Sequence, residues 1–148
     1  MTEVSFYHLT TRPLEWALPR LLEKVVATGK RAVVMAGSEE RVEALNAQLW
    51  TYDPASFLPH GSVRDGTPEE QPIWLTRAEE NPNGASILVL TDGVASPGIG
   101  GFERCLDLFD GNDAGQLAAA RERWAVAKAA GHAVTYWRQT AAGGWEKG

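Results

Sequence analysis

Short apolar runs spaced along the chain limit what it can fold into. Residues 32–36 (AVVMA) and 87–90 (ILVL) have the length of buried strands and fall far below the roughly 20 residues that cross a bilayer. Between such runs, apolar residues recur at helical spacing, as at 14–26 and 42–49. Strands that alternate with helices favour a largely parallel sheet with helices on both faces. We therefore expect an α/β fold and no membrane-spanning segment.

Capping and breaking residues mark the ends of the expected elements. Thr11 can cap the first helix and Gly29 can end it, while Pro19 predicts a kink or a later start. The terminal Trp145 is expected to pack back onto the sheet. The expected helices are 14–28, one that begins after Ser38, and 114–130; the expected strands are 4–9, 31–36, 73–76 at an edge of the sheet, 87–91, 105–109 and 134–138.

Size, charge and cysteine content narrow the class of protein. A chain of 148 residues has room for one compact domain, 1–148. Fourteen Lys and Arg against nineteen Asp and Glu leave a formal charge of −5, so the surface as a whole repels phosphate backbones. The single Cys105 excludes a disulfide framework and a Cys-based zinc site. The first residues lack the features of a signal peptide, so the expected compartment is the cytoplasm.

The phosphate-binding motifs of α/β proteins are absent from the sequence. No G-x-x-x-x-G-K-[ST] segment occurs. The GIGG segment at 98–101 begins like a dinucleotide fingerprint, but Glu103 occupies the third glycine position. No nucleophile with a neighbouring base is identifiable either. We therefore expect no cofactor, no metal and no catalytic activity.

Two carboxylates keep an enzyme open as the alternative. Asp92 and Asp110 each follow an expected strand, where an open α/β sheet presents metal-binding or catalytic carboxylates. Each also precedes a glycine, and Asp-Gly is a common turn signal. We expect turns at both positions; the alternative is an α/β enzyme of unknown reaction with a strand-end carboxylate site. The scattered histidines His8, His60 and His132 are expected to be structural.

The expected helix over 114–130 carries a mixed stripe of side chains. Leu117, Arg121, Trp124 and Lys128 fall within one arc of about 60° in a helical projection. Such a stripe suits an acidic peptide that ends in an apolar side chain and a free carboxylate. The alternative is a solvated flank with Trp124 in the core. Alanines fill the next arc and suit close approach to the sheet: Ala114, Ala118, Ala125 and Ala129.

Residues 50–72 show neither helical nor strand periodicity and contain several turn-forming Pro and Gly residues. This predicts a long loop with at most one short strand, and loops of that length are usually functional. The segment either binds a partner, since Trp and Tyr dominate interface energetics, or packs onto the core. Its apolar side chains are Trp50, Tyr52, Phe57, Leu58 and Pro59.

Two residue combinations are specific when taken together: Leu49-Trp50 followed by PASFLPH at 54–60, and ARERW at 120–124. With them the chain resembles, from end to end, the chi subunit of bacterial DNA polymerase III holoenzyme, an accessory subunit of the clamp-loader assembly. The remaining matches are Phe6-Tyr7, Phe102-Glu103, DLF at 107–109, Gly131 and Trp145.

The resemblance implies a single-domain, three-layer Rossmann-like fold without nucleotide chemistry, and a non-catalytic adaptor in DNA replication. Members of this family bind the acidic C-terminal tail of single-stranded-DNA-binding protein. They connect that tail to the clamp loader, commonly through a small psi subunit. Such an adaptor contacts DNA only indirectly, which agrees with the negative net charge.

The resemblance also implies roles for individual residues. Arg121 matches the family's tail-binding arginine, and Trp124 stands where an aromatic residue lines the tail's apolar pocket, with Leu117 beside it. The family's lysine four residues after that arginine is Ala125 here, and Lys128 on the same face is expected to substitute for it.

A second surface is implied on the loader side. Whether its partner is psi or the loader itself stays open at this point. Direct binding of single-stranded DNA by exposed aromatic residues with basic neighbours stays open as another alternative. The residues of the loader-side surface are Trp50, Phe57, Leu58, Pro59 and His60.

Overall fold

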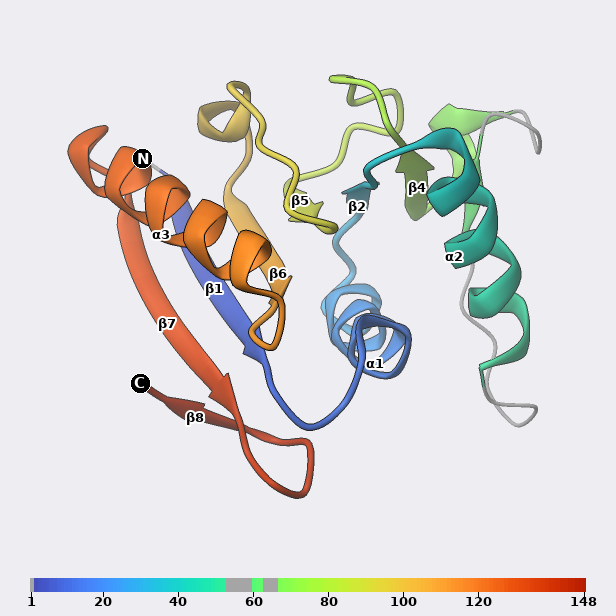
Figure 1. The fold of residues 1–148 in the computed structure, drawn as a ribbon. Helices are drawn as coiled ribbons and strands as arrows, with labels where there is room; N and C mark the ends of the chain where they lie inside the picture. Colours follow the sequence, from blue (N-terminus) through green and yellow to red (C-terminus); the bar gives the residue numbers. More distant parts are fainter. Residues whose placement is uncertain (1, 53–59, 63–66) are drawn as a thin grey trace.

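The computed structural model describes residues 2–52, 60–62 and 67–148, which form one sheet with three α-helices (Figure 1). The sheet has eight strands in the order β3-β4-β2-β5-β6-β1-β7-β8. All neighbouring strands are parallel except β7 and β8. The expected α/β fold with a mostly parallel sheet is confirmed. In chain order the elements are β1 (Glu3–Leu9), α1 (Leu14–Ala27), β2 (Ala32–Met35), α2 (Glu39–Thr51), β3 (Gly61–Ser62), the 3-10 helix η1 (Pro68–Glu70), β4 (Ile73–Thr76), β5 (Ile87–Leu90), the 3-10 helix η2 (Ile99–Gly101), β6 (Arg104–Asp110), α3 (Ala114–Ala129), β7 (Ala133–Gln139) and β8 (Trp145–Lys147).

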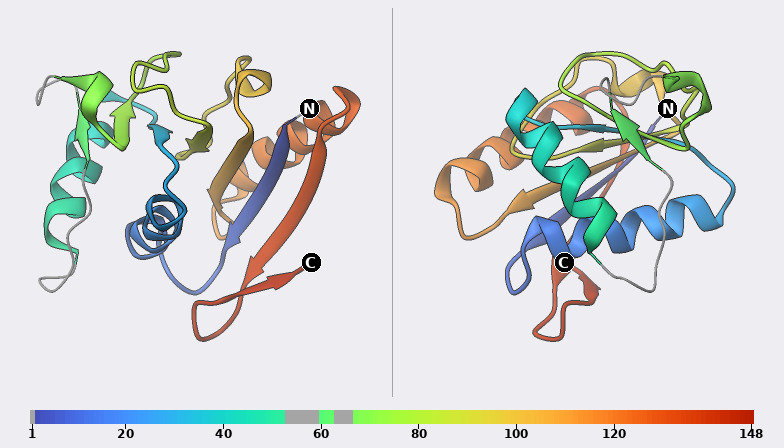
Figure 2. Two further views of the ribbon diagram at one scale, coloured as in Figure 1. Left: turned by 180° about the vertical axis from the view of Figure 1, so that it is seen from behind. Right: turned by 90° about the vertical axis from the view of Figure 1, so that its right-hand side faces the viewer.

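Helices cover both faces of the sheet, as the sequence predicts. On one face, Leu22 of α1 and Leu45 of α2 are buried together with Val34 of β2. On the other face, α3 lies over β1, β6 and β7, where Ala120 packs in a cluster with Phe6. Figure 1 shows α3 and α2 at opposite ends of the sheet, and in both views of Figure 2 the β7–β8 hairpin projects beyond the other strands. None of the helices in the described ranges is long and apolar enough to cross a membrane.

Two expectations about strand and helix limits are wrong. β4 is not an edge strand, because the short β3 pairs with it on one side and β2 on the other. All four β4 residues are buried, as is usual for a continuous apolar run in a parallel sheet. Trp50 belongs to the last turn of α2 rather than to a loop, and β3 is the one short strand expected after it.

Pro19 lies inside α1, so the helix neither ends nor begins there. A proline has no N–H to donate to the carbonyl four residues earlier, which leaves the Glu15 carbonyl without its helical partner. The Gln48 side chain, from α2, donates its Nε2 hydrogen to the Glu15 carbonyl at 2.7 Å. Thr11 does not cap α1; its hydroxyl donates to the Thr140 carbonyl instead. Helix α1 therefore tolerates its proline through a contact with α2.

Removal of this contact has an expected thermodynamic signature. Gln48→Met keeps the side-chain volume but leaves the Glu15 carbonyl without a donor, so it should lower the free energy of unfolding by about 1 kcal/mol. In a Pro19→Ala background the new Ala N–H can supply that hydrogen bond, and the same Gln48→Met change should then be nearly neutral. Urea unfolding of the wild type, Gln48→Met, Pro19→Ala and the double variant measures the coupling energy between positions 19 and 48. Equal losses in both backgrounds would contradict this explanation of Pro19.

Candidate functional site

A cavity of about 320 Å³ opens between α3 and the strands beneath it. Helix α3 contributes its wall from one side, and β1, β6 and β7 supply the floor and the opposite wall. We call this cavity the α3 pocket. Its lining residues are Phe6, His8, Phe109, Leu117, Ala120, Arg121, Trp124 and Tyr136.

Aromatic rings form most of the α3 pocket. Trp124 packs against Phe6 at a centroid distance of 5.3 Å and faces Tyr136 at 6.3 Å with nearly perpendicular planes. His8 packs against Phe109 at 5.0 Å. Tilted and edge-to-face contacts of this kind stabilise a ring cluster and hold each ring in place. The pocket therefore offers a preformed apolar volume to a ligand side chain.

Arg121 supplies the positive charge of the α3 pocket. Its side chain is exposed at the pocket, and no carboxylate in the described part of the chain pairs with it. Its field reaches the pocket floor: burial lowers the pKa of His8, and the charges of Arg138 and Arg121 lower it further, whereas Asp110 raises it. The pocket is thus apolar inside and cationic at its rim.

The orientation of α3 corrects one expectation. Ala114, Ala118, Ala125 and Ala129 are exposed, so the alanine arc predicted to face the sheet faces solvent. The sheet-facing residues are instead Ala120 and Ala127, with the half-buried Leu117 and Trp124 beside them.

A buried ion pair explains this orientation. Arg123 donates from Nε to Asp107 Oδ2 at 2.6 Å and from Nη2 to Asp107 Oδ1 at 2.9 Å. The Asp107 side chain is 2% exposed, so its charge needs a partner on the helix above it. Arg123 also donates to the Gly93 carbonyl at 3.2 Å, which ties α3 to the loop after β5. With Arg123 directed at β6, Arg121 lies on the side of α3 that borders the pocket.

His8 and Tyr136 form a polar contact within the pocket. His8 Nδ1 and the Tyr136 hydroxyl are hydrogen bonded, and the rings lie 5.7 Å apart with planes inclined at 68°. Glycine is required at position 111, because a β-carbon there would overlap His8 Nε2 and crowd the Leu9 carbonyl. The His8 ring is therefore held on both sides, by Tyr136 and by the backbone after β6.

The structure brings three of the predicted tail-binding residues together, namely Leu117, Arg121 and Trp124. Lys128 is exposed on the same helix but does not line the α3 pocket. The helical spacing in the sequence does not point to the residues that the strands contribute to the pocket, which are Phe6, His8, Phe109 and Tyr136. Alternation along β1 places Phe6 and His8 on one face, but only the strand register brings Phe109 and Tyr136 to them.

The predicted loader-side residues are only partly within the described ranges. Trp50 is 53% exposed at the end of α2, and its ring lies 4.7 Å from that of His60. His60 itself is buried, and its Nε2 is 3.2 Å from the Asn46 carbonyl. Phe57, Leu58 and Pro59 lie outside the described residues. Trp50 therefore presents a large apolar surface on the opposite face of the sheet from the α3 pocket.

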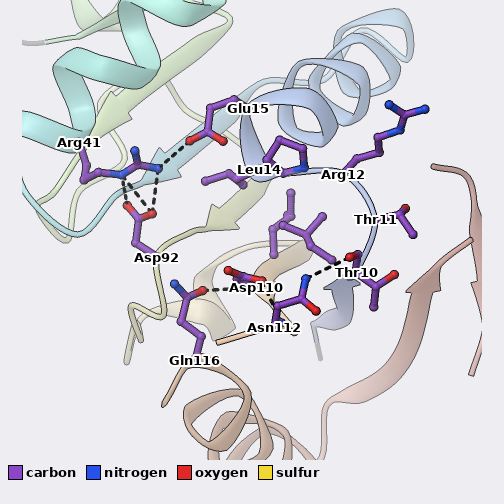
Figure 3. Close-up of a pocket in the computed structure, with 13 residues that line it drawn as sticks. Thr10, Thr11, Arg12, Leu14, Glu15, Arg41, Asp92, Asp110, Asn112 and Gln116 are labelled. Atoms are coloured by element: carbon purple, nitrogen blue, oxygen red, sulfur yellow. Dashed lines mark hydrogen bonds and ion pairs between the residues drawn. The ribbon is translucent and has the colours of Figure 1, made fainter. Parts of the chain in front are cut away.

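The two strand-end carboxylates lie in a different cavity, of about 310 Å³ (Figure 3). The Asp92 carboxylate is already hydrogen bonded within the protein. It accepts hydrogen bonds from Arg41 Nε and Nη2 at 3.1–3.2 Å and from the Gly37 N–H at 3.1 Å. Asp110 accepts from the Asn112 N–H at 2.9 Å, as an Asp-Gly turn does. Within the described ranges, no group of three or more His, Cys, Asp or Glu side chains could hold a metal ion.

Comparison with known proteins identifies relatives of this chain. Residues 1–135 match the model of a family described as DNA polymerase III chi subunit, HolC. That range includes every residue of the α3 pocket except Tyr136. A curated protein of Rickettsia prowazekii (strain Madrid E), described as a probable DNA polymerase III subunit chi, is 39% identical over 90 residues. The aligned region covers 61% of this chain and 54% of that relative, so the chain spans about half the length of the curated relative it matches.

Proposed function

The chain belongs to the DNA polymerase III chi subunit family, whose members are accessory subunits in DNA replication, and on that premise we propose that it is a non-catalytic adaptor. One surface binds the acidic C-terminal tail of single-stranded-DNA-binding protein, and another binds the clamp loader, through psi or directly. In this way the adaptor would link the template strand, which is coated with single-stranded-DNA-binding protein, to the polymerase assembly.

The observation that carries the tail-binding proposal is an arginine without an acidic partner in the described chain, at the rim of an aromatic pocket. A tail of the proposed kind ends in an apolar side chain and a carboxylate. The apolar side chain fits among Trp124, Leu117 and Phe6, while the carboxylate pairs with Arg121. Charge-assisted hydrogen bonds of this sort contribute about 1.5–3 kcal/mol each when shielded from water.

Lys128 extends the cationic side of α3 beyond the pocket. Acidic residues that precede the tail's terminus would meet it there, since an extended peptide leaving the pocket can run along the helix. This contact is more exposed than the one at Arg121, so Lys128 contributes less to affinity and more to the association rate. In this proposal Ala125, at the family's lysine position, has no part in charge recognition.

The test is titration of a synthetic acidic peptide, with an apolar last residue and a free carboxylate, by isothermal calorimetry. Arg121→Ala should weaken binding about tenfold or more, and the wild-type affinity should fall as salt is added. Arg77→Ala removes an exposed arginine that pairs with Glu39 of α2 and does not line the α3 pocket, so tail affinity should be unchanged. Wild-type affinity in Arg121→Ala would place the tail site elsewhere.

A mobility-shift assay with bare oligonucleotide separates this proposal from direct DNA binding. The formal charge of −5 predicts weak binding of the bare oligonucleotide. Tight, length-dependent binding would favour the single-stranded-DNA binder instead.

A further inference from the structure

The hydrogen-bonded pair of His8 and Tyr136 has the chemistry of a switchable donor. Both side chains line the α3 pocket, and each reaches it from a different strand, β1 and β7. When His8 is neutral and protonated at Nε2, its Nδ1 can only accept, so the Tyr136 hydroxyl hydrogen points at the imidazole. That arrangement leaves the hydroxyl with no hydrogen for a ligand.

We propose that His8 takes up a proton when a carboxylate enters the α3 pocket, which turns the Tyr136 hydroxyl from His8 towards the carboxylate. This inference rests on the proposed tail-binding function and assigns His8 and Tyr136 to recognition of the tail's terminal carboxylate. The proton goes from solvent to the imidazole, whose Nδ1–H then donates to Tyr136 Oη. The hydroxyl hydrogen is freed and donates to the carboxylate oxygen.

The charges around His8 favour protonation of its imidazole only when an anion is bound in the pocket. Arg121 faces it from α3 and Arg138 from β7, and both oppose a further positive charge on the imidazole. Asp110, at the end of β6, favours that charge. Arg138 is itself paired with Glu146 of β8, with the nearest atoms 3.6 Å apart. A bound carboxylate would offset the field of Arg121 and make protonation of His8 favourable.

The sign of the pH dependence follows from this linkage. Burial and the two arginines place the pKa of free His8 below its ordinary value, and a bound carboxylate raises it. Affinity must then increase as the pH falls from the bound-state pKa to the free-state pKa. The peptide's own carboxylates titrate near pH 4, below this interval. Tail affinity should rise about three- to tenfold from pH 8 to pH 5.5, since a pKa difference of one unit corresponds to a factor of ten.

The experiment is calorimetric titration of the acidic peptide at several pH values between 5.5 and 8, with the wild type and two variants. His8→Gln should abolish the increase in affinity at low pH, whatever its affinity at pH 8, because glutamine takes up no proton in this range. His132→Gln is the matched control: its imidazole accepts from the Thr2 N–H, outside the pocket, so the increase should persist. A peptide with an amidated C-terminus should bind weakly and without pH dependence.

The possible results separate this inference from the proposed function. A pH dependence that survives in His8→Gln, or a flat profile in the wild type, overturns the role of His8 and leaves tail binding intact. Failure of the free-acid peptide to bind at any pH overturns both. NMR titration of the His8 ring protons gives an independent readout, with a higher pKa expected in the peptide complex than in the free protein.

Discussion

Replacing Arg123 with leucine is expected to lower the free energy of unfolding by about 3–5 kcal/mol at pH 7, the usual result of leaving one member of a buried ion pair alone. The Asp107 carboxylate is almost fully buried and takes two hydrogen bonds from Arg123. Without the guanidinium, Asp107 either keeps an uncompensated charge in the interior or takes up a proton. Thermal and denaturant unfolding measure the loss.

A second variant distinguishes an ion-pair effect from a packing effect. Changing both residues to leucine removes the buried charge together with its partner, so Asp107→Leu/Arg123→Leu should recover most of the stability lost in the single variant. The recovery will be incomplete because the contact from Arg123 to the Gly93 carbonyl is absent in both. A double variant no more stable than Arg123→Leu would show that packing, rather than charge, accounts for the loss.

The loss should also depend on pH. Burial already raises the pKa of Asp107, and Arg123 opposes that rise. In Arg123→Leu the opposition is gone, so the folded-state pKa lies further above the value of about 3.9 in an unfolded chain. Such a group destabilises the folded state as the pH rises from the unfolded pKa through the folded one. The variant should therefore lie closer to the wild type at pH 5 than at pH 7.

The same ion pair connects stability to the proposed tail site. Arg121 and Arg123 are two residues apart on α3, but Arg121 lines the α3 pocket whereas Arg123 pairs with a buried carboxylate. Loss of Arg123 removes contacts that hold α3 to β6 and to the loop after β5, which would also weaken the support of Arg121 and Trp124 over the pocket floor. The segment ARERW thus contains one arginine that pairs with a buried carboxylate and one that is exposed at the α3 pocket.

Much of the fold can be predicted from the sequence because most strands appear as short local runs of apolar residues. The runs at 32–36 and 87–90 are apolar on both faces, as is typical of strands at the centre of a parallel sheet, and both are fully buried strands in the structure. Helix α3 shows where such reasoning ends. Its projection offers two arcs that could face the sheet, and the choice depends on a carboxylate from a different part of the chain, Asp107.

Of the residues that line the α3 pocket, only those on the helix can be predicted from the sequence. Leu117, Arg121 and Trp124 share one helix, so their spacing is a property of the sequence. His8 and Tyr136 meet because β1 and β7 are parallel neighbours in one particular register, with Phe6 opposite Tyr136. Register depends on the whole sheet, and nothing local to either strand specifies it.

Replacing Trp50 with alanine is expected to weaken association with the clamp loader at least about 30-fold, the size of a tryptophan hot spot of about 2 kcal/mol. Trp50 is 53% exposed, and a partner that covers its ring would remove a large apolar surface from water. The measurement is binding of the purified clamp loader, with and without psi, to immobilised wild type and variant.

Tail binding should be unchanged in Trp50→Ala, because α2 and α3 pack on opposite faces and at opposite ends of the sheet (Figure 1). Val126→Ala is the matched control: Val126 is 68% exposed on α3, and its loss should affect the loader-side association little.

Loss of tail and loader binding together in Trp50→Ala, with a lowered Tm, would point to a folding defect. Normal loader binding by a folded Trp50→Ala would remove Trp50 from the interface. The proposed adaptor role requires that both partners bind at once. The two surfaces must then be separable by mutation, and a comparison of Trp50→Ala with Arg121→Ala tests that requirement.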